Sequence, residues 1–186
     1  MIDGCIRGDL LVQKSFYYQY YPILMRICVR YATNKEDAEQ WVHDGFVKIF
    51  ASLPKYKHEG SFEGWLKKIM VRLCIDNLRC QNAQKHEIEN NTVYDSDPAL
   101  DVHYVHNDFT LKTDTDDLLR IINLLPEKQK MVFNLIVFED YTHKEVAALL
   151  NITENHSYLL LYQARQQLKT HLQKHVEKKE VKYEQK

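Results

Sequence analysis

The chain has 186 residues, of which 45% are hydrophobic and 27% charged, and its formal net charge is −1. This composition is ordinary for a globular protein with a buried core, and the near-neutral charge excludes a uniformly basic nucleic-acid binder of the histone type. No stretch approaches the ~20 apolar residues of a membrane span, so we expect a soluble, cytoplasmic protein without membrane insertion.

Charge is unevenly distributed along the chain. Residues 1–80 carry a net charge of +3, residues 81–117 carry −7 and residues 118–186 carry +3. Glycine and proline, which weaken helix interiors, are scarce, with five and four copies. We therefore predict an all-α fold, in which two small helical domains are joined by an acidic linker.

The predicted domain boundaries follow this change in charge. Residues 82–114 show no sustained periodicity and are rich in Asn, Asp, His and Thr. A structureless stretch of this length is more easily placed between two domains than inside one. We place the first domain at residues 1–82, the linker at 83–114, the second domain at 115–173, and a charged tail that we expect to fray at 174–186.

The first domain is predicted to hold four helices. Apolar residues recur with helical spacing over residues 9–32, and Pro22 there suits the first turn of a new helix. Ser61 is a suitable N-cap for the last of the four. We expect helices at residues 9–20, 22–32, 35–53 and 61–81.

On the third predicted helix, the apolar residues share one face and should pack in the core. They are Ala38, Val42, Gly45, Phe46, Ile49 and Leu53. The adjacent, outward face carries Trp41 among Asp37, Gln40 and Asp44. An exposed aromatic residue among acidic ones indicates a protein partner with a basic surface. The alternative is that Trp41 packs against the first two helices.

Basic residues gather with an aromatic one on a flank of the fourth predicted helix. The flank carries Trp65, Lys68, Arg72 and Arg79, and the loop before it carries Lys55 and Lys57. Cations neutralise phosphates and an aromatic ring stacks on an unpaired base, so this set suits single-stranded or melting DNA. The alternative is that Trp65 belongs to the core and the cations form a solvated face.

The second domain is predicted to be a helix-turn-helix domain. Thr142 and Glu145 form a capping box, and Thr153 can cap the helix that follows. Asn151 tolerates the left-handed conformation of the turn between those two helices. We expect helices at residues 115–124, 127–138, 143–150 and 154–172.

Several separated motifs together resemble a known family. The segments are DAEQWVHDGFVKI (37–49), GSFEGWL (60–66), IDNLR (75–79), LPEKQKMVF (125–133), YTHKEVAALL (141–150) and AR (164–165). In this order they resemble bacterial RNA polymerase sigma factors of the extracytoplasmic-function (ECF) class. The first three resemble sigma region 2 and the last three resemble sigma region 4, in wording closest to Bacteroidetes-type versions.

The resemblance implies that the protein binds core RNA polymerase, recognises a promoter and starts transcription. The polymerase-binding residues, placed against the clamp coiled coil of the largest subunit, would be Asp37, Gln40, Trp41, His43, Asp44 and Phe46. Those at the −10 element would be Lys55, Lys57, Ser61, Trp65, Lys68, Arg72 and Arg79. Those at the −35 element would be Thr153, Asn155, His156, Tyr158, Leu159, Tyr162, Gln163 and Arg165. The class also implies an anti-sigma factor as a partner.

The sequence departs from the family pattern most in the helix expected at the −35 element. Tyr158 and Gln163 stand where the family usually has Lys and Arg, so the outward face lacks a fixed positive charge. Asn and Gln side chains can still read adenine, and Leu159 or Tyr162 can touch thymine methyls. Readout of the −35 element is therefore altered rather than lost, although an outward Leu159 also fits a protein contact. Arg72 stands where Asn is frequent, which predicts a changed −10 preference.

Three functions remain open from the sequence. The first is a working sigma factor with a divergent −35 helix. The second is a sigma-like adaptor that binds polymerase or an anti-sigma protein without reading a −35 element, and the third is a helix-turn-helix regulator that acts without polymerase. We expect no enzyme, cofactor or metal, because the four cysteines and nine histidines show no ligand spacing and no glycine-rich phosphate loop occurs.

Overall fold

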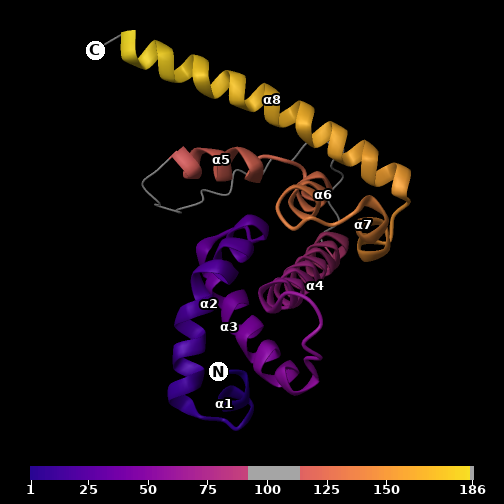
Figure 1. Cartoon of the computed structure of the whole chain (residues 1–186). Helices are drawn as coiled ribbons and strands as arrows, with labels where there is room; N and C mark the ends of the chain where they lie inside the picture. The colour runs from indigo at the N-terminus through magenta and orange to yellow at the C-terminus, as the bar shows by residue number, and fades with distance from the viewer. Residues whose placement is uncertain (92–113, 185–186) are drawn as a thin grey trace. The chain divides into compact units, whose positions relative to one another are not determined.

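The computed structural model describes residues 1–91 and 114–184, with side chains over 1–83 and 117–174. Every regular element of these residues is a helix, as predicted (Figure 1). The chain divides into two compact units, one formed by α1–α4 and the other by α5–α8. The predicted linker at 83–114 lies mostly outside the described residues.

The first unit packs three long helices against one another. Its elements are α1 (Ile2–Ile6), α2 (Leu10–Tyr31), α3 (Lys35–Ser52), the 3₁₀ turn η1 (Leu53–Lys55) and α4 (Phe62–Asn91). Helices α2, α3 and α4 contact each other in every pair, so they share one core. The apolar face predicted for α3, from Ala38 to Leu53, is buried.

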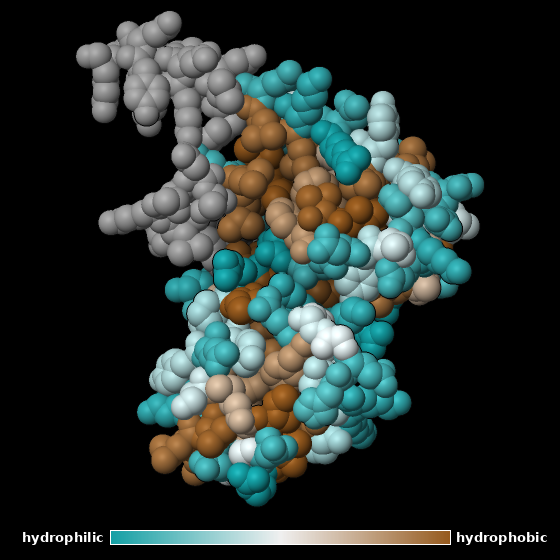
Figure 2. Space-filling model, viewed as in Figure 1, coloured by the Kyte–Doolittle hydropathy of each residue, from teal (hydrophilic) through white to brown (hydrophobic). Residues whose placement is uncertain are grey.

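Helix α1 was not among the helices predicted from the sequence. Its Cys5 is buried, which raises the pKa of that thiol, and Gln13 of α2 donates a hydrogen bond to the Cys5 carbonyl over 3.1 Å. Figure 2 shows hydrophobic side chains exposed in the lower part of the view. At the beginning of α2, Leu10 and Leu11 are 78% and 77% exposed.

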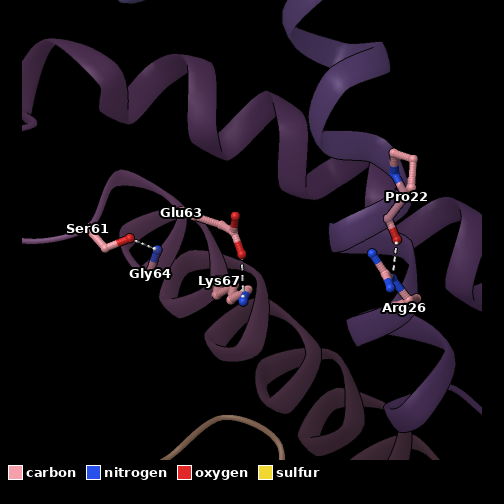
Figure 3. Close-up of polar contacts among 6 residues, drawn as sticks. All are labelled: Pro22, Arg26, Ser61, Glu63, Gly64 and Lys67. Atoms are coloured by element: carbon pink, nitrogen blue, oxygen red, sulfur yellow. Dashed lines mark hydrogen bonds and ion pairs between the residues drawn. The ribbon is translucent and has the colours of Figure 1, made fainter.

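The expectation that Pro22 begins a new helix is wrong, because α2 continues through it. Proline removes the hydrogen bond that its N–H would donate to the carbonyl of Tyr18. Both Pro22 and Tyr18 are exposed, so water can satisfy that carbonyl. On the C-terminal side, Arg26 Nε donates to the Pro22 carbonyl over 3.2 Å (Figure 3). The break in the helix ladder is therefore confined to solvent, where it costs least.

Helix α4 begins where predicted and ends later. Ser61 Oγ accepts the Gly64 N–H over 3.3 Å, which confirms the cap (Figure 3). The helix ends at Asn91 rather than near Gln81, so its last turns enter the predicted linker. Cys80 is exposed, although the helical repeat of α4 predicts a core position for it. The residues of α4 that are buried in the core of the first unit include Met70 and Cys74.

A glycine of α3 makes room for a core side chain of α4. A Cβ added to Gly45 would clash with the Met70 terminal methyl, so the absence of a side chain there lets Met70 pack against α3. Met70 Sδ lies 3.3 Å from Cys28 Sγ, which ties the same point to α2. Gly45, which lowers helix propensity, thus serves close packing.

The second unit contains the predicted helix-turn-helix. Its elements are α5 (Asp114–Asn123), α6 (Glu127–Val137), α7 (His143–Leu150) and α8 (Glu154–Glu184). The capping box of Thr142 and Glu145 is present, and Asn151 adopts the left-handed conformation with φ 54°. Thr153 Oγ1 accepts the His156 N–H over 3.2 Å at the beginning of α8. These local predictions are confirmed.

The predicted end of α8 is wrong. The helix continues to Glu184 instead of ending near residue 172, so the tail expected to fray is helical over most of its length. The helical repeat of α8 predicts a core face of Leu161, Ala164, Leu168 and Leu172. The first three are buried, whereas Leu172 is 41% exposed, because the core of this unit ends before it.

Helix α6 buries polar side chains where an apolar stripe would be ordinary. Lys130 is buried, and its Nζ donates to Asn123 Oδ1 over 3.4 Å. Burial lowers the pKa of Lys130 to about 8, and nearby Glu127 opposes the shift. The pKa of a lysine in the unfolded chain is ~10.4. Between about pH 8 and about pH 10.4 the unfolded chain therefore binds more protons at Lys130 than the folded chain does. The contribution of Lys130 to stability therefore rises as the pH rises through that window.

We predict that Lys130→Met stabilises the protein at pH 7. The variant removes the cost of burying a charge, worth on the order of 2–3 kcal/mol of unfolding free energy. Its advantage should shrink at pH 9.5, where the native lysine is largely neutral. Thermal unfolding at the two pH values measures this, with exposed Lys128→Met as the matched control. An advantage that is equal at both pH values would contradict the interpretation.

Candidate nucleic-acid interface

The basic flank predicted on α4 is exposed. Lys68, Arg72 and Arg79 point to solvent, and Arg79 pairs loosely with Asp76 over 3.9 Å. The next cation along, Lys67, is engaged by Glu63 over 2.7 Å (Figure 3). The three exposed cations are spaced along one side of a single rigid helix, which suits a row of phosphates.

Trp65 is half-buried within a group of aromatic rings. The Tyr56 ring lies 4.9 Å from it, and the Phe62 ring stacks beside it at 5.8 Å. Tyr56 also contacts His58, which holds a positive φ of 57° in the loop. Trp65 is therefore neither a fully buried core residue nor a free surface residue, but a ring held in place with part of its surface in solvent.

Tyr56 and His58 are residues that the sequence-based prediction missed. The prediction selected the cations of this loop, Lys55 and Lys57, which are both exposed. An aromatic residue between two lysines was a usable signal, since alternating cations and rings is the composition of single-strand binding surfaces. Together with exposed Ser61, these residues and the flank of α4 form what we call the α4 surface.

The prediction that Trp41 lies on an outward face of α3 is wrong. Its side chain is 4% exposed and that of Phe46 is 3% exposed, so both support the core and neither offers a contact surface. Trp41 lies at the border between the apolar and polar faces, where helical spacing cannot separate an inward ring from an outward one. Packing of the helices decides its direction.

The exposed residues in the middle of α3 are polar at Gln40, His43 and Asp44, and Val47, 69% exposed, follows on the same side. Gln40 Nε2 donates to Asp44 Oδ1 over 3.0 Å, and His43 lies face to face with the ring of Tyr17 at 5.9 Å. Burial raises the pKa of Tyr17, so its hydroxyl stays protonated. This stripe of amide, imidazole and carboxylate groups, at Gln40, His43 and Asp44, is called the α3 surface below.

Asp37, the remaining residue predicted on this face, is half-buried, and one of its carboxylate oxygens accepts three hydrogen bonds. Its Oδ2 accepts from Thr33 Oγ1 over 3.1 Å, from Asn34 Nδ2 over 3.1 Å and from Gln81 Nε2 over 3.2 Å. Gln81 belongs to α4, so the carboxylate connects the beginning of α3 to the far helix. Its role in this structure is to hold the two helices together.

In the second unit, the residues predicted on α8 are exposed except Gln163, which is half-buried. Gln163 Oε1 accepts from Gln129 Nε2 of α6 over 3.4 Å. Tyr158, 54% exposed, stacks on the ring of His143 at 3.6 Å, while His143 Nδ1 hydrogen-bonds Ser157 Oγ at 2.9 Å. These contacts fix α8 against α6 and α7 and leave one face of α8 open.

Two family descriptions match the chain, one in each unit. Residues 16–84 match Sigma-70 region 2, and residues 115–168 match Sigma-70, region 4. Together the two matches cover more than half of the chain and lie in the order that the motifs indicated. The chain is a sigma factor of the sigma-70 family. Region 2 thus corresponds to α2–α4 and region 4 to the helix-turn-helix unit.

Curated relatives of this protein are also described as RNA polymerase sigma factors. It is 29% identical over 81% of its length to the ECF RNA polymerase sigma factor SigE of Mycolicibacterium smegmatis, of which it spans 57%. It is 27% identical over 80% of its length to RNA polymerase sigma factor SigV of Bacillus subtilis, of which it spans 84%. These matches support the ECF class.

Two solved complexes contain a chain of similar fold. One is the sigma factor RpoE with the anti-sigma factor NepR from Bartonella quintana, at 18% identity and TM-score 0.57, covering 86% of this chain and 96% of that one. Another is CnrH with the cytosolic domain of CnrY, at 16% identity and TM-score 0.51, covering 92% and 94%. At these identities they show the shared fold.

We predict that Trp41→Ala destabilises this sigma factor by about 3 kcal/mol, the usual cost of deleting a buried Trp side chain. Trp65→Ala is the matched comparison, and its half-buried ring should cost less. Urea unfolding followed by circular dichroism measures both variants. A Trp41→Ala protein of unchanged stability would place this ring back on the surface.

Proposed function

We propose that this sigma factor binds core RNA polymerase and directs promoter-specific initiation through three separate surfaces. The α4 surface would contact the −10 element, the α3 surface would bind polymerase, and the open face of α8 would lie in the major groove at the −35 element. The observation that carries the proposal is the α4 surface, because cations in a row beside a held aromatic ring suit melting DNA.

Exposed Lys68, Arg72 and Arg79 can neutralise successive phosphates of one strand. Beside them, Tyr56 and Phe62 limit the movement of Trp65, so little side-chain entropy is lost when a base stacks on its free surface. An unpaired base gains more from stacking than a paired one, so the surface favours the open form of the promoter. This is the physical basis for strand opening.

The α3 surface suits a basic partner, since Asp44 supplies a carboxylate and Gln40 an amide that orients it. The family position implies that this partner is the clamp coiled coil of the largest subunit. Trp41 and Phe46, placed among the contacts by the resemblance, would act from the core by fixing the direction of α3.

Other parts of the proposal rest on the family. An anti-sigma factor is proposed as a regulatory partner, because the solved neighbours include a sigma factor with an anti-sigma factor. A cytoplasmic, non-enzymatic role is proposed, since the relatives are sigma factors; none of the described helices is long and apolar enough to cross a bilayer. The wording of the motifs supports a Bacteroidetes-type origin, and the charge pattern supports domains at 1–82 and 115–173.

A sigma-like adaptor is the second candidate function. The observation that favours it is the exposure of Tyr158, Leu159 and Tyr162 on α8, which a protein could also cover. Run-off transcription with core polymerase on genomic promoter fragments separates the two functions. A working sigma factor produces transcripts of defined length, whereas an adaptor binds core polymerase and produces none.

We predict that Arg72→Ala lowers promoter opening roughly tenfold, the loss of one charged hydrogen bond, and leaves binding to core polymerase unchanged. Permanganate footprinting measures opening and a pull-down measures binding. Lys35→Ala is the control, because this exposed cation on α3 pairs with Glu39 and lies outside the α4 surface. Undiminished opening by Arg72→Ala would remove this residue from the −10 contact.

We predict that Asp44→Arg weakens binding to core polymerase by at least about tenfold, since it places like charges face to face. The residue is exposed, so the fold should survive. Asp3→Arg, an equal change of charge on α1, should leave affinity unaltered. Fluorescence anisotropy of labelled protein provides the measurement, and equal affinities for the two variants would argue against the α3 surface.

A further inference from the structure

The open face of α8 carries an uncharged stripe along its centre. Residues one helical step apart on this face are Asn155, Leu159, Tyr162 and Gln166, and all four are exposed. Leu159 is 51% exposed and Tyr162 is 62% exposed. An amide therefore stands at each end of the stripe, and two apolar side chains lie between them.

Cations border the stripe, and Lys169 lies one helical step beyond its last amide, Gln166. Arg165 and Lys169 are exposed on α8, and Lys144 is exposed on α7. This is the distribution that a major-groove helix needs, since phosphates border the groove on both sides while base edges form its floor. Over residues 154–174 of α8 the only acid is Glu154, at the first position of the helix.

The chemistry of the stripe matches A·T base pairs. In the major groove, thymine presents its 5-methyl group, and adenine presents an acceptor and a donor that an Asn or Gln amide binds together. A G·C pair presents no methyl, and its usual partner is Arg or Lys, which the stripe lacks. Leu159 and Tyr162 can bury methyls, while Asn155 and Gln166 can pair with adenine.

Neighbouring contacts make the stripe rigid enough to read sequence. Tyr158 is held on His143 at 3.6 Å, and Gln163 is held by Gln129 at 3.4 Å, so the residues on both sides of the stripe are anchored to α7 and α6. The helix cannot turn about its axis without breaking both contacts. The stripe therefore stays directed outward.

We infer that α8 recognises A·T base pairs by burying thymine 5-methyl groups against Leu159 and Tyr162. The inference rests on the proposed function, because it specifies what the −35 contact reads. The partner of the apolar face is therefore DNA. The amides at the ends of the stripe suit base edges, and the cations at its edge suit phosphates. A dry protein interface would leave these polar groups without partners. Discrimination then comes from methyl burial more than from charge, so it persists as salt rises.

The test uses the holoenzyme, assembled from core polymerase and the full chain, on promoters with a randomised −35 region. Selected promoters should be enriched in A·T pairs at adjacent positions. Each selected thymine is then replaced by uracil, which differs only in lacking the methyl, while the −10 element keeps its thymines. Each contacted methyl should be worth about a fourfold change in affinity.

Two variants assign the effect to the stripe. Leu159→Ala should remove most of the difference between thymine and uracil, and its exposed position keeps the fold intact. Lys169→Ala is the control: it should weaken binding to all sequences alike and leave the ratio between thymine and uracil unchanged.

The outcomes separate the inference from the function beneath it. Equal affinity for thymine and uracil promoters, with transcription intact, would overturn the inference and leave the proposed function standing. Selection of G·C pairs would overturn it as well. A third outcome combines two results: the holoenzyme starts no transcription on any promoter, and Leu159→Ala weakens only the binding of core polymerase or of an anti-sigma protein. The stripe is then a protein-docking face, and the proposed function fails too.

Discussion

Phe16 is the side chain on which the first unit depends. It is fully buried on α2, and its ring contacts Phe46 and Phe50 of α3 at 6.3 and 5.5 Å and Phe62 of α4 at 6.0 Å. One ring thus joins all three long helices. Because Phe62 also stacks beside Trp65, the same packing that stabilises the core sets the position of the exposed aromatic surface. Stability and the proposed DNA contact therefore depend on one cluster of rings.

Much of this fold could be predicted from residues whose effect is local. The caps at Ser61 and Thr153, the capping box at Thr142 and the left-handed Asn151 depend on a few neighbouring atoms, and each appears in the structure. The buried face of α3 was predictable because its apolar residues follow the helical repeat. Such signals are readable because residues close together in the sequence determine them.

Errors arose where tertiary packing or solvent decides the outcome. Trp41 lies at the edge of a helical face, and the neighbouring helices bury it. Pro22 was expected to begin a helix, but α2 continues through it. The position is exposed, so water can bind the carbonyl that lacks its helical donor. Helices α4 and α8 extend beyond their apolar faces, where periodicity gives no end signal. Tyr56 was missed because its importance comes from the ring that it touches, nine residues away.

The carboxylate of Asp37 has a mechanical consequence. It accepts hydrogen bonds from Thr33 and Asn34 at the start of α3 and from Gln81 on α4. A movement of α3 relative to α4 would break the bond to Gln81. Together with the packing of α3 against α4, this hydrogen bond couples the orientations of the two helices. A partner bound to α3 would therefore also restrain the basic flank of α4.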